Sequence, residues 1–288
     1  MTEREIPMKN LSVLILLIII ALLAAGCSIA PLPGAEPTDI GEKTGATLVL
    51  KDKTPVEVRE TAEVTNYCLE DGSVILVIDK PVLLEESPKD PFYTDTVRPG
   101  QDFGFSKLTP EAKEAIREFL ETKPPHFDLN KQLERAWVRY RKYSKDQDFH
   151  PFRILQRHYP CAESEKVIYI MTEAEGMKDE WSTDNEQTTA AFDKTTGERI
   201  PPEELFTCST EELAEIMVRL SGLSNEAKMQ EMIRAFDLSH LVVYPGQTYL
   251  WYPEGTLKDQ TPAKYWLTFD NVEEIQSLYH PWARPFAY

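Results

Sequence analysis

The sequence of 288 residues is poor in the residue types that build metal sites and nucleophilic active sites. It has four cysteines, five histidines and twelve glycines, without a CxxC pair, an HExxH motif or a phosphate-binding glycine loop. Gly-x-Ser-x-Gly and Ser-x-x-Lys nucleophile motifs are also absent. His150 and His158 share a strand-like segment, where extended chain would separate them by about 26 Å. We therefore expect no cofactor, no metal and no catalytic residue, although a pair of carboxylates that meets only in space stays open.

The charge of the chain is strongly acidic. Acidic residues outnumber basic ones by 48 to 31, which gives a formal net charge of −17. Phosphate contacts need clustered Lys and Arg, so nucleic acid is not an expected partner. A basic protein would be attracted to such a chain, although an acidic surface also serves simply to keep a cell-surface protein soluble.

The chain begins with an uncharged apolar run at residues 11–25. This run is shorter than the roughly 20 residues that a spanning helix needs, and Gly26 and Cys27 end it before a Pro-rich segment. Residues 23–27 (Leu-Ala-Ala-Gly-Cys) match the lipobox of bacterial lipoproteins. We therefore expect residues 1–26 to be a signal peptide that is removed, and Cys27 to carry diacylglycerol.

Two acyl chains give stable anchoring, which predicts an extracytoplasmic protein held to the bacterial cell membrane by lipid, with palmitate among its acyl chains. Starting at Met8 would give the positive segment that export signals carry, so the choice between Met1 and Met8 stays open. The alternative is an uncleaved membrane helix that ends in a chance cysteine.

We expect residues 27–45 to be a tether. Beyond it, the pattern of apolar residues predicts an α+β fold. A hairpin turn at Asp71-Gly72 joins two strand-like runs, residues 56–69 and 73–84. Helix signals begin at Thr109, Asp128, Ser209, Ser224 and Asp270, each followed by an apolar stripe. Further strands are expected at residues 152–159, 167–172, 187–192, 241–244, 247–252 and 264–269. We expect antiparallel sheets with helix pairs packed on one side, in two halves of similar size, residues 46–175 and 176–288.

Three cysteines remain once Cys27 is lipidated: Cys68, Cys161 and Cys208. This odd number is too small for a disulfide framework. At most one bridge can form, and whether it forms stays open. Cys68 lies in a strand-like run and is the cysteine most expected to be buried.

The densest acidic stretch runs from residue 173 to residue 186 and contains one tryptophan, Trp181. We interpret it first as a solvated loop, and second as a docking face for a basic protein or a sugar ring. The candidate ligand-binding residues are Glu173, Glu175, Asp179, Glu180, Trp181 and Asp184.

Residues 192–198 (Phe-Asp-Lys-Thr-Thr-Gly-Glu), followed by Glu204-Leu205-Phe206, resemble the C-terminal extracellular domain of RsiV-type anti-sigma factors and PdaC-type peptidoglycan deacetylases. The aromatic runs at residues 249–253 and 266–269 are similar too, and the upstream half resembles the domain that precedes it in those proteins. The Gly and His-Pro element frequent in that family is replaced here by residues 177–181.

The resemblance implies an α+β sensor or binding module of the cell envelope, because RsiV-type ectodomains bind lysozyme. Sigma-factor inhibition is not expected, since only about ten residues precede Leu11. Our leading hypothesis is a non-enzymatic surface lipoprotein that binds a lysozyme-like basic protein or peptidoglycan. The alternative is a cell-wall glycan hydrolase or a deacetylase-associated glycan-binding protein, and a third possibility is a structural accessory. Two carboxylates in a Trp-lined site would favour a hydrolase.

The lipobox gives a direct prediction. Cells labelled with a fatty-acid analogue should incorporate the label into the wild-type chain and not into Cys27→Ala, because only the Cys27 thiol accepts the diacylglyceryl group. Equal labelling of the two chains would contradict lipidation at this residue.

Overall fold

A computed structural model describes residues 40–84, 104–122, 127–146, 149–177, 183–258, 265–270 and 272–286. Ile40–Tyr288 forms one compact unit. The expected signal peptide and the lipidation site Cys27 lie outside the described residues, as do Asp179, Glu180 and Trp181. Among the described helices, none has the length and apolar character that crossing a membrane requires.

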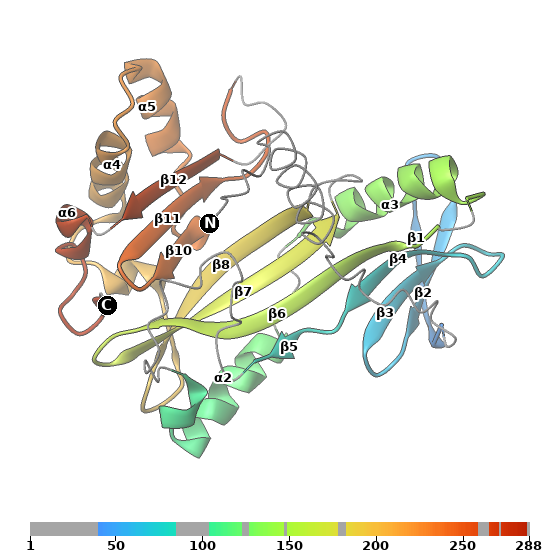
Figure 1. Ribbon diagram of the computed structural model, residues 1–288, viewed down its shortest axis with the longest axis horizontal. Helices are drawn as coiled ribbons and strands as arrows, with labels where there is room; N and C mark the ends of the chain where they lie inside the picture. The colour runs from blue at the N-terminus through green and yellow to red at the C-terminus, as the bar shows by residue number, and fades with distance from the viewer. Residues whose placement is uncertain are drawn as a thin grey trace, which may run out of the picture. The chain divides into compact units, whose positions relative to one another are not determined.

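A nine-stranded sheet organises the chain (Figure 1). Its strands follow the order β1-β2-β3-β4-β6-β7-β8-β9, and β5 pairs with β6. Neighbours are antiparallel except for the parallel pairs β4–β6 and β5–β6, which a long crossover separates in sequence. The strands are β1 (Glu42–Val49), β2 (Pro55–Glu60), β3 (Val64–Cys68), β4 (Val74–Asp79), β5 (Val82–Leu83), β6 (Phe152–Glu163), β7 (Val167–Met177), β8 (Thr183–Asp193) and β9 (Arg199–Ile200).

A second, smaller sheet and the helices cover the large one. The small sheet has the order β10-β11-β12, and both of its pairings are antiparallel. Its strands are β10 (Leu241–Tyr244), β11 (Gln247–Tyr252) and β12 (Tyr265–Asp270). The helices are η1 (Phe105–Lys107), α2 (Pro110–Thr122), α3 (Leu129–Tyr143), η2 (Pro202–Leu205), α4 (Thr210–Leu220), α5 (Glu226–Arg234), η3 (Leu238–His240) and α6 (Glu273–Gln276).

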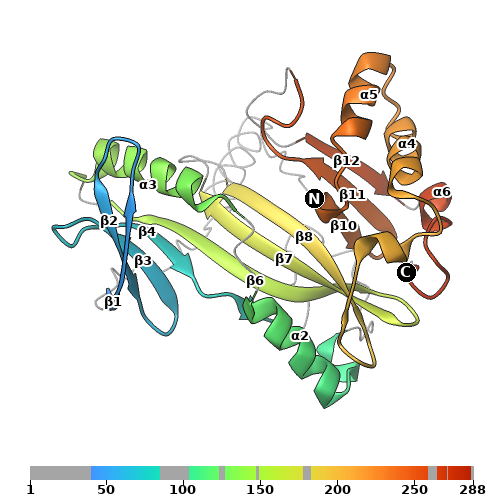
Figure 2. The same cartoon turned by 180° about the vertical axis from the view of Figure 1, so that it is seen from behind.

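Strand β7 is buried on both of its faces, because successive side chains point to opposite sides of a strand. Ile168 and Ile170 pack with Ile116 of α2 on one face. Tyr169 and Met171 belong to a separate core on the other face, together with α4 and the small sheet. Figure 2 shows α2 beneath β6 to β8 and the small sheet above them. The middle of the large sheet is therefore covered on both sides.

The fold class predicted from the sequence, α+β, is confirmed. The expected boundary between residues 175 and 176 falls inside β7, which pairs with β8 over its whole length. Both expected halves therefore share one sheet within a single compact unit.

Several helix starts occur where the capping signals predicted them. The side chain of Asp128 accepts a hydrogen bond from the Lys131 backbone N–H, and Ser209 accepts one from the Glu212 N–H. The predicted cap at Ser224 is wrong by one residue, because the Asn225 side chain accepts from Lys228 instead. The helix expected to open at Asp270 begins at Glu273, because β12 continues through Asp270.

The strand ends differ more from the sequence pattern. The run at residues 56–69 is divided, because a turn between Glu60 and Val64 separates β2 from β3. Strand β7 continues through Met177, although the sequence from Glu173 onward predicts a polar loop. Cross-strand partners on β6 and β8 explain this extension, because they neutralise the charge that would otherwise favour solvent.

The C-terminal segment closes over the turn between β6 and β7. The Tyr169 hydroxyl donates a hydrogen bond to the Ala283 carbonyl, which lies 114 residues later in the chain. The Phe286 backbone N–H donates to the Glu163 carbonyl at 2.9 Å, and the Lys166 N–H donates to the Trp282 carbonyl at 3.2 Å. These hydrogen bonds therefore join the last described residues to the central hairpin.

All three remaining cysteines are free thiols. Cys68 and Cys161 are buried, as expected for Cys68, whereas Cys208 is half-exposed. Burial raises the pKa of the Cys161 thiol to about 12. Burial also raises the pKa of Cys68 and that of Cys208, where the nearby Glu212 adds to the effect.

Thiol reactivity tests this arrangement. In native residues 40–288, a thiol reagent should modify Cys208 first, because the reactive thiolate needs access to solvent. Cys68 and Cys161 should react only after unfolding. Fewer than three reactive thiols in denaturant without reductant would instead indicate a disulfide.

Candidate functional site

The acidic stretch predicted as a docking face begins inside the large sheet. Glu173 lies on β7 with 4% of its surface exposed, and its carboxylate forms an ion pair with Arg157 of β6. The Gln187 side-chain amide of β8 donates to the other carboxylate oxygen at 2.8 Å. These three residues face one another across three adjacent strands, and we call them the Glu173 network. Their pairing explains how a carboxylate is tolerated at a buried position.

The solvated-loop interpretation is therefore wrong for Glu173 and Glu175. Glu175 follows on the same face of β7, half-buried, with its carboxylate 3.7 Å from an Arg157 guanidinium nitrogen. Asp184 lies in β8 in register with Gly176. Three members of the predicted set thus lie in strands of the sheet, and Asp179, Glu180 and Trp181 lie outside the described residues.

Two tyrosines extend the polar network towards the small sheet. The hydroxyl groups of Tyr159 on β6 and Tyr244 on β10 hydrogen-bond to each other. Burial raises the pKa of Tyr159, and the negative charge of Glu173 raises it further. Burial likewise raises the pKa of Tyr244. Both phenols therefore stay protonated and can act as hydrogen-bond donors at neutral pH.

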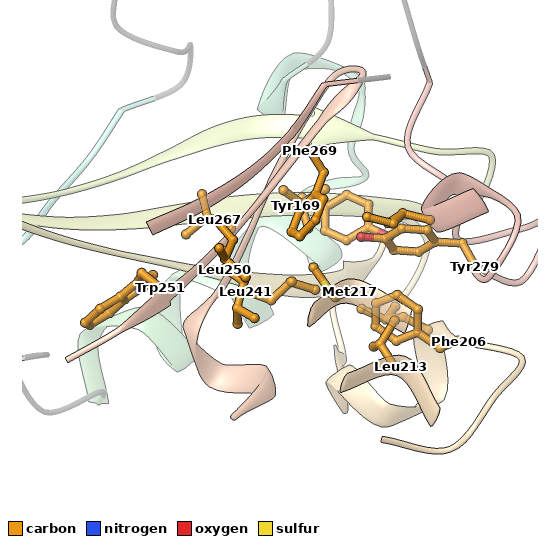
Figure 3. Packing of buried hydrophobic residues seen from close by; sticks show 14 of the residues in the cluster. Tyr169, Phe206, Leu213, Met217, Leu241, Leu250, Trp251, Leu267, Phe269 and Tyr279 are labelled. Atoms are coloured by element: carbon orange, nitrogen blue, oxygen red, sulfur yellow. The ribbon is translucent and has the colours of Figure 1, made fainter. Parts of the chain in front are cut away.

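One face of the small sheet carries a row of aromatic rings. Trp251 of β11 and Trp266 of β12 are direct cross-strand partners, stacked with centroids 5.9 Å apart and planes 29° apart. Tyr249 meets Trp266 edge-on at 6.5 Å and Tyr244 at 5.6 Å. We call these four residues the aromatic row. The opposite face of the same sheet packs Leu250, Leu267 and Phe269 into the core (Figure 3).

Gln187 connects the aromatic row to the Glu173 network. While its side chain binds Glu173, its backbone carbonyl accepts a hydrogen bond from the Trp251 indole N–H at 2.8 Å. Trp251 is held in this way with 4% of its surface exposed, whereas Trp266 beside it is 38% exposed. We call the aromatic row and the Glu173 network together the aromatic corner. In the aromatic corner, the exposed Trp266 ring therefore lies against the buried Trp251 ring.

The alternation of aromatic residues in the sequence is a signal for the aromatic row. Tyr249 and Trp251 alternate along one strand, so they must share a face, and Trp266 lies near the start of the next strand. The sequence could not show that this face meets Gln187. His158, which the sequence placed on a strand with His150, is buried, and its Nδ1 lies 2.9 Å from the Thr172 hydroxyl. Within the described residues, no group of three or more His, Cys, Asp or Glu is placed to hold a metal ion.

Two solved structures resemble this chain weakly. A crystal structure of a DUF3298 family protein from Pseudomonas aeruginosa PAO1 is 13% identical, with a TM-score of 0.36, and the match covers 81% of this chain and 97% of that chain. A member of the same family from Bacteroides fragilis is 11% identical, with a TM-score of 0.33 and coverage of 83% and 96%. No family model and no curated protein matches the sequence.

The Glu173 network predicts a large effect of removing one partner. Arg157→Met leaves the buried carboxylate without this counter-charge, which typically costs about 3–5 kcal/mol for a fully buried pair. Because the Arg157 side chain is 35% exposed, we expect a smaller loss of unfolding free energy, about 2 kcal/mol.

A double variant provides the control. Arg157→Met combined with Glu173→Leu removes both charges and should recover most of the loss in urea unfolding. Losses that simply add would show that the two residues do not act as a pair.

Proposed function

We propose that this chain is a non-enzymatic binding module at the outer surface of a bacterial membrane, with a basic protein of the lysozyme class as its ligand. The observation that carries the proposal is the exposed Trp266 ring, stacked on the fixed Trp251 in a chain with a net charge of −17. The sequence resemblance to lysozyme-binding ectodomains points to the same class of ligand.

Charge supports recognition of a basic ligand at long range. A net charge of −17 attracts cations and speeds their association, an effect that salt screens over roughly 8 Å at physiological ionic strength. Near the aromatic corner, Asp270 is exposed on the same face of β12 as Trp266. Arg157 is the cation of the corner, and Glu173 and Glu175 offset its charge.

Trp266 supports recognition at short range. A Lys or Arg side chain over a Trp face gains roughly 0.5–2 kcal/mol, and tryptophan is enriched among the residues that dominate binding energies. Trp251 holds one side of the ring, so little conformational entropy remains to be lost on binding. The exposed ring can therefore serve as the anchor that Trp181 was expected to provide.

The Glu173 network supports a binding role over hydrolysis. A glycosidase needs one carboxyl group that carries a proton and gives it to the leaving group. Glu173 instead lies against a guanidinium and accepts an amide hydrogen bond, so both of its carboxylate oxygens already have partners within the fold.

A wall saccharide is the second candidate ligand, favoured by the geometry of the aromatic row. Stacked, rigid tryptophans with polar neighbours suit the flat apolar face of a sugar ring. Binding to purified peptidoglycan in place of lysozyme would support this candidate.

Surface plasmon resonance tests the proposal with residues 40–288 immobilised and lysozyme as the analyte. Affinity should fall as salt rises, and Trp266→Ala should weaken binding by roughly 30-fold, mainly through faster dissociation. Phe286→Ala is the matched control, because this aromatic side chain is 43% exposed but lies outside the aromatic corner.

Two outcomes would contradict specific recognition. One is the absence of binding at low salt. The other is equal binding of lysozyme to an unrelated acidic protein of the same net charge.

A further inference from the structure

Helix α3 is a cationic element in an otherwise acidic chain. Its fifteen residues contain five cations and one anion, a net charge of +4, whereas the whole chain carries −17. The cations are Lys131, Arg135, Arg139, Arg141 and Lys142, and Lys145 follows the helix directly.

The inner side of α3 is fixed to the part of the sheet that contains β1 to β4. Leu133 and Ala136 are buried in a core with Leu76 of β4. The Trp137 indole N–H donates to the Asp52 carboxylate at 2.7 Å. Glu134, the helix's one acid, accepts a hydrogen bond from the Lys51 backbone N–H at 2.6 Å. The one carboxylate of α3 thus forms its hydrogen bond on the side of the helix that faces the fold.

The outer side combines cations, aromatic rings and an exposed aliphatic residue. Val138 is 65% exposed, and Arg141 and Lys142 are exposed beyond it. The Lys142 ammonium lies 4.5 Å from the centre of the Tyr143 ring, and the Arg139 guanidinium lies 5.7 Å from it.

The helix dipole alone does not account for this surface. It favours cations in the last turn, which explains Arg141 and Lys142. It does not explain Arg139 one turn earlier or the exposed Val138. Cations interleaved with apolar and aromatic side chains are typical of helices that lie on membrane surfaces.

A second observation connects α3 to the membrane. The described chain begins at Ile40, whose carbonyl accepts a hydrogen bond from the Asn66 side chain of β3 at 3.2 Å. β3 pairs with β4, the strand against which α3 packs, and the register places Asn66 beside Val77, on the face opposite to Leu76 and α3. Cys27 lies thirteen residues before Ile40, so covalent geometry limits Ile40 itself to within about 45 Å of Cys27.

We propose that the C-terminal half of α3, with Arg139, Arg141, Lys142 and Lys145, binds the anionic headgroups of the membrane to which Cys27 anchors the chain. The inference uses the predicted lipid anchor and is independent of the ligand proposed for the aromatic corner. Each Lys or Arg near an anionic surface strengthens binding about fivefold. The anchor holds the helix near the surface at an effective concentration in the millimolar range, so weak intrinsic affinity suffices.

The acidic remainder of the chain does not prevent this contact at physiological salt. Charges more than about 8 Å from the membrane are largely screened there. The negative elements are repelled only where they approach the headgroups, so repulsion adds to the preference for α3 as the contacting surface.

Co-sedimentation with vesicles tests the proposal, using residues 40–288 because they form one compact unit with their own cores. At 0.15 M salt and millimolar lipid, the protein should bind vesicles of equal phosphatidylglycerol and phosphatidylcholine. It should not bind pure phosphatidylcholine, and it should leave the mixed vesicles in about 0.5 M salt.

Two triple variants separate the helix from general charge. Arg139→Gln with Arg141→Gln and Lys142→Gln should lower the bound fraction more than tenfold. Lys166→Gln with Arg219→Gln and Arg234→Gln removes the same charge from exposed positions elsewhere and should bind as the parent does. Urea midpoints confirm that each variant is folded.

Absence of binding to the mixed vesicles would overturn the proposal. Equal binding to both vesicle types would also overturn it, as would an equal loss in the two triple variants.

Discussion

The burial of β7 on both faces is the constraint on which the rest of the structure depends. Its side chains alternate between a core that contains α2 and a core that contains the small sheet, so neither layer can be removed without exposing apolar surface. Within such a strand a carboxylate is tolerated only with a partner. Glu173 therefore requires Arg157 on one neighbouring strand and Gln187 on the other.

This requirement also positions the aromatic row. Gln187 uses its side chain for Glu173 and its backbone carbonyl for Trp251, so the polar network and the tryptophan pair share one residue. The exposed face of Trp266 then follows from the cross-strand register that places it on Trp251. A surface anchor is in this way connected, through two hydrogen bonds, to a charge pair in the large sheet.

Sequence patterns predicted the elements of the fold better than their ends. Capping residues such as Asp128 and Ser209 bond to backbone N–H groups three residues later, so the local sequence is enough to predict where these helices start. The end of β7 depends on partners at positions 157 and 187, and no local pattern contains that information. The same limit applies to the site, since Glu173 was identified as a candidate but its buried pairing was not. The hydrogen bond from Trp251 to Gln187 likewise joins residues that are distant in sequence.

The closure of the C-terminal segment has a consequence for how the protein matures. During synthesis the chain emerges from its N-terminal end, yet Tyr169 finds its hydrogen-bond partner only at Ala283 and Glu163 finds one at Phe286. The core around the central hairpin therefore cannot be completed until the last residues have been released. Contacts this distant in sequence also slow folding. Until then the partly emerged chain exposes apolar strands, which favours aggregation unless these strands are protected.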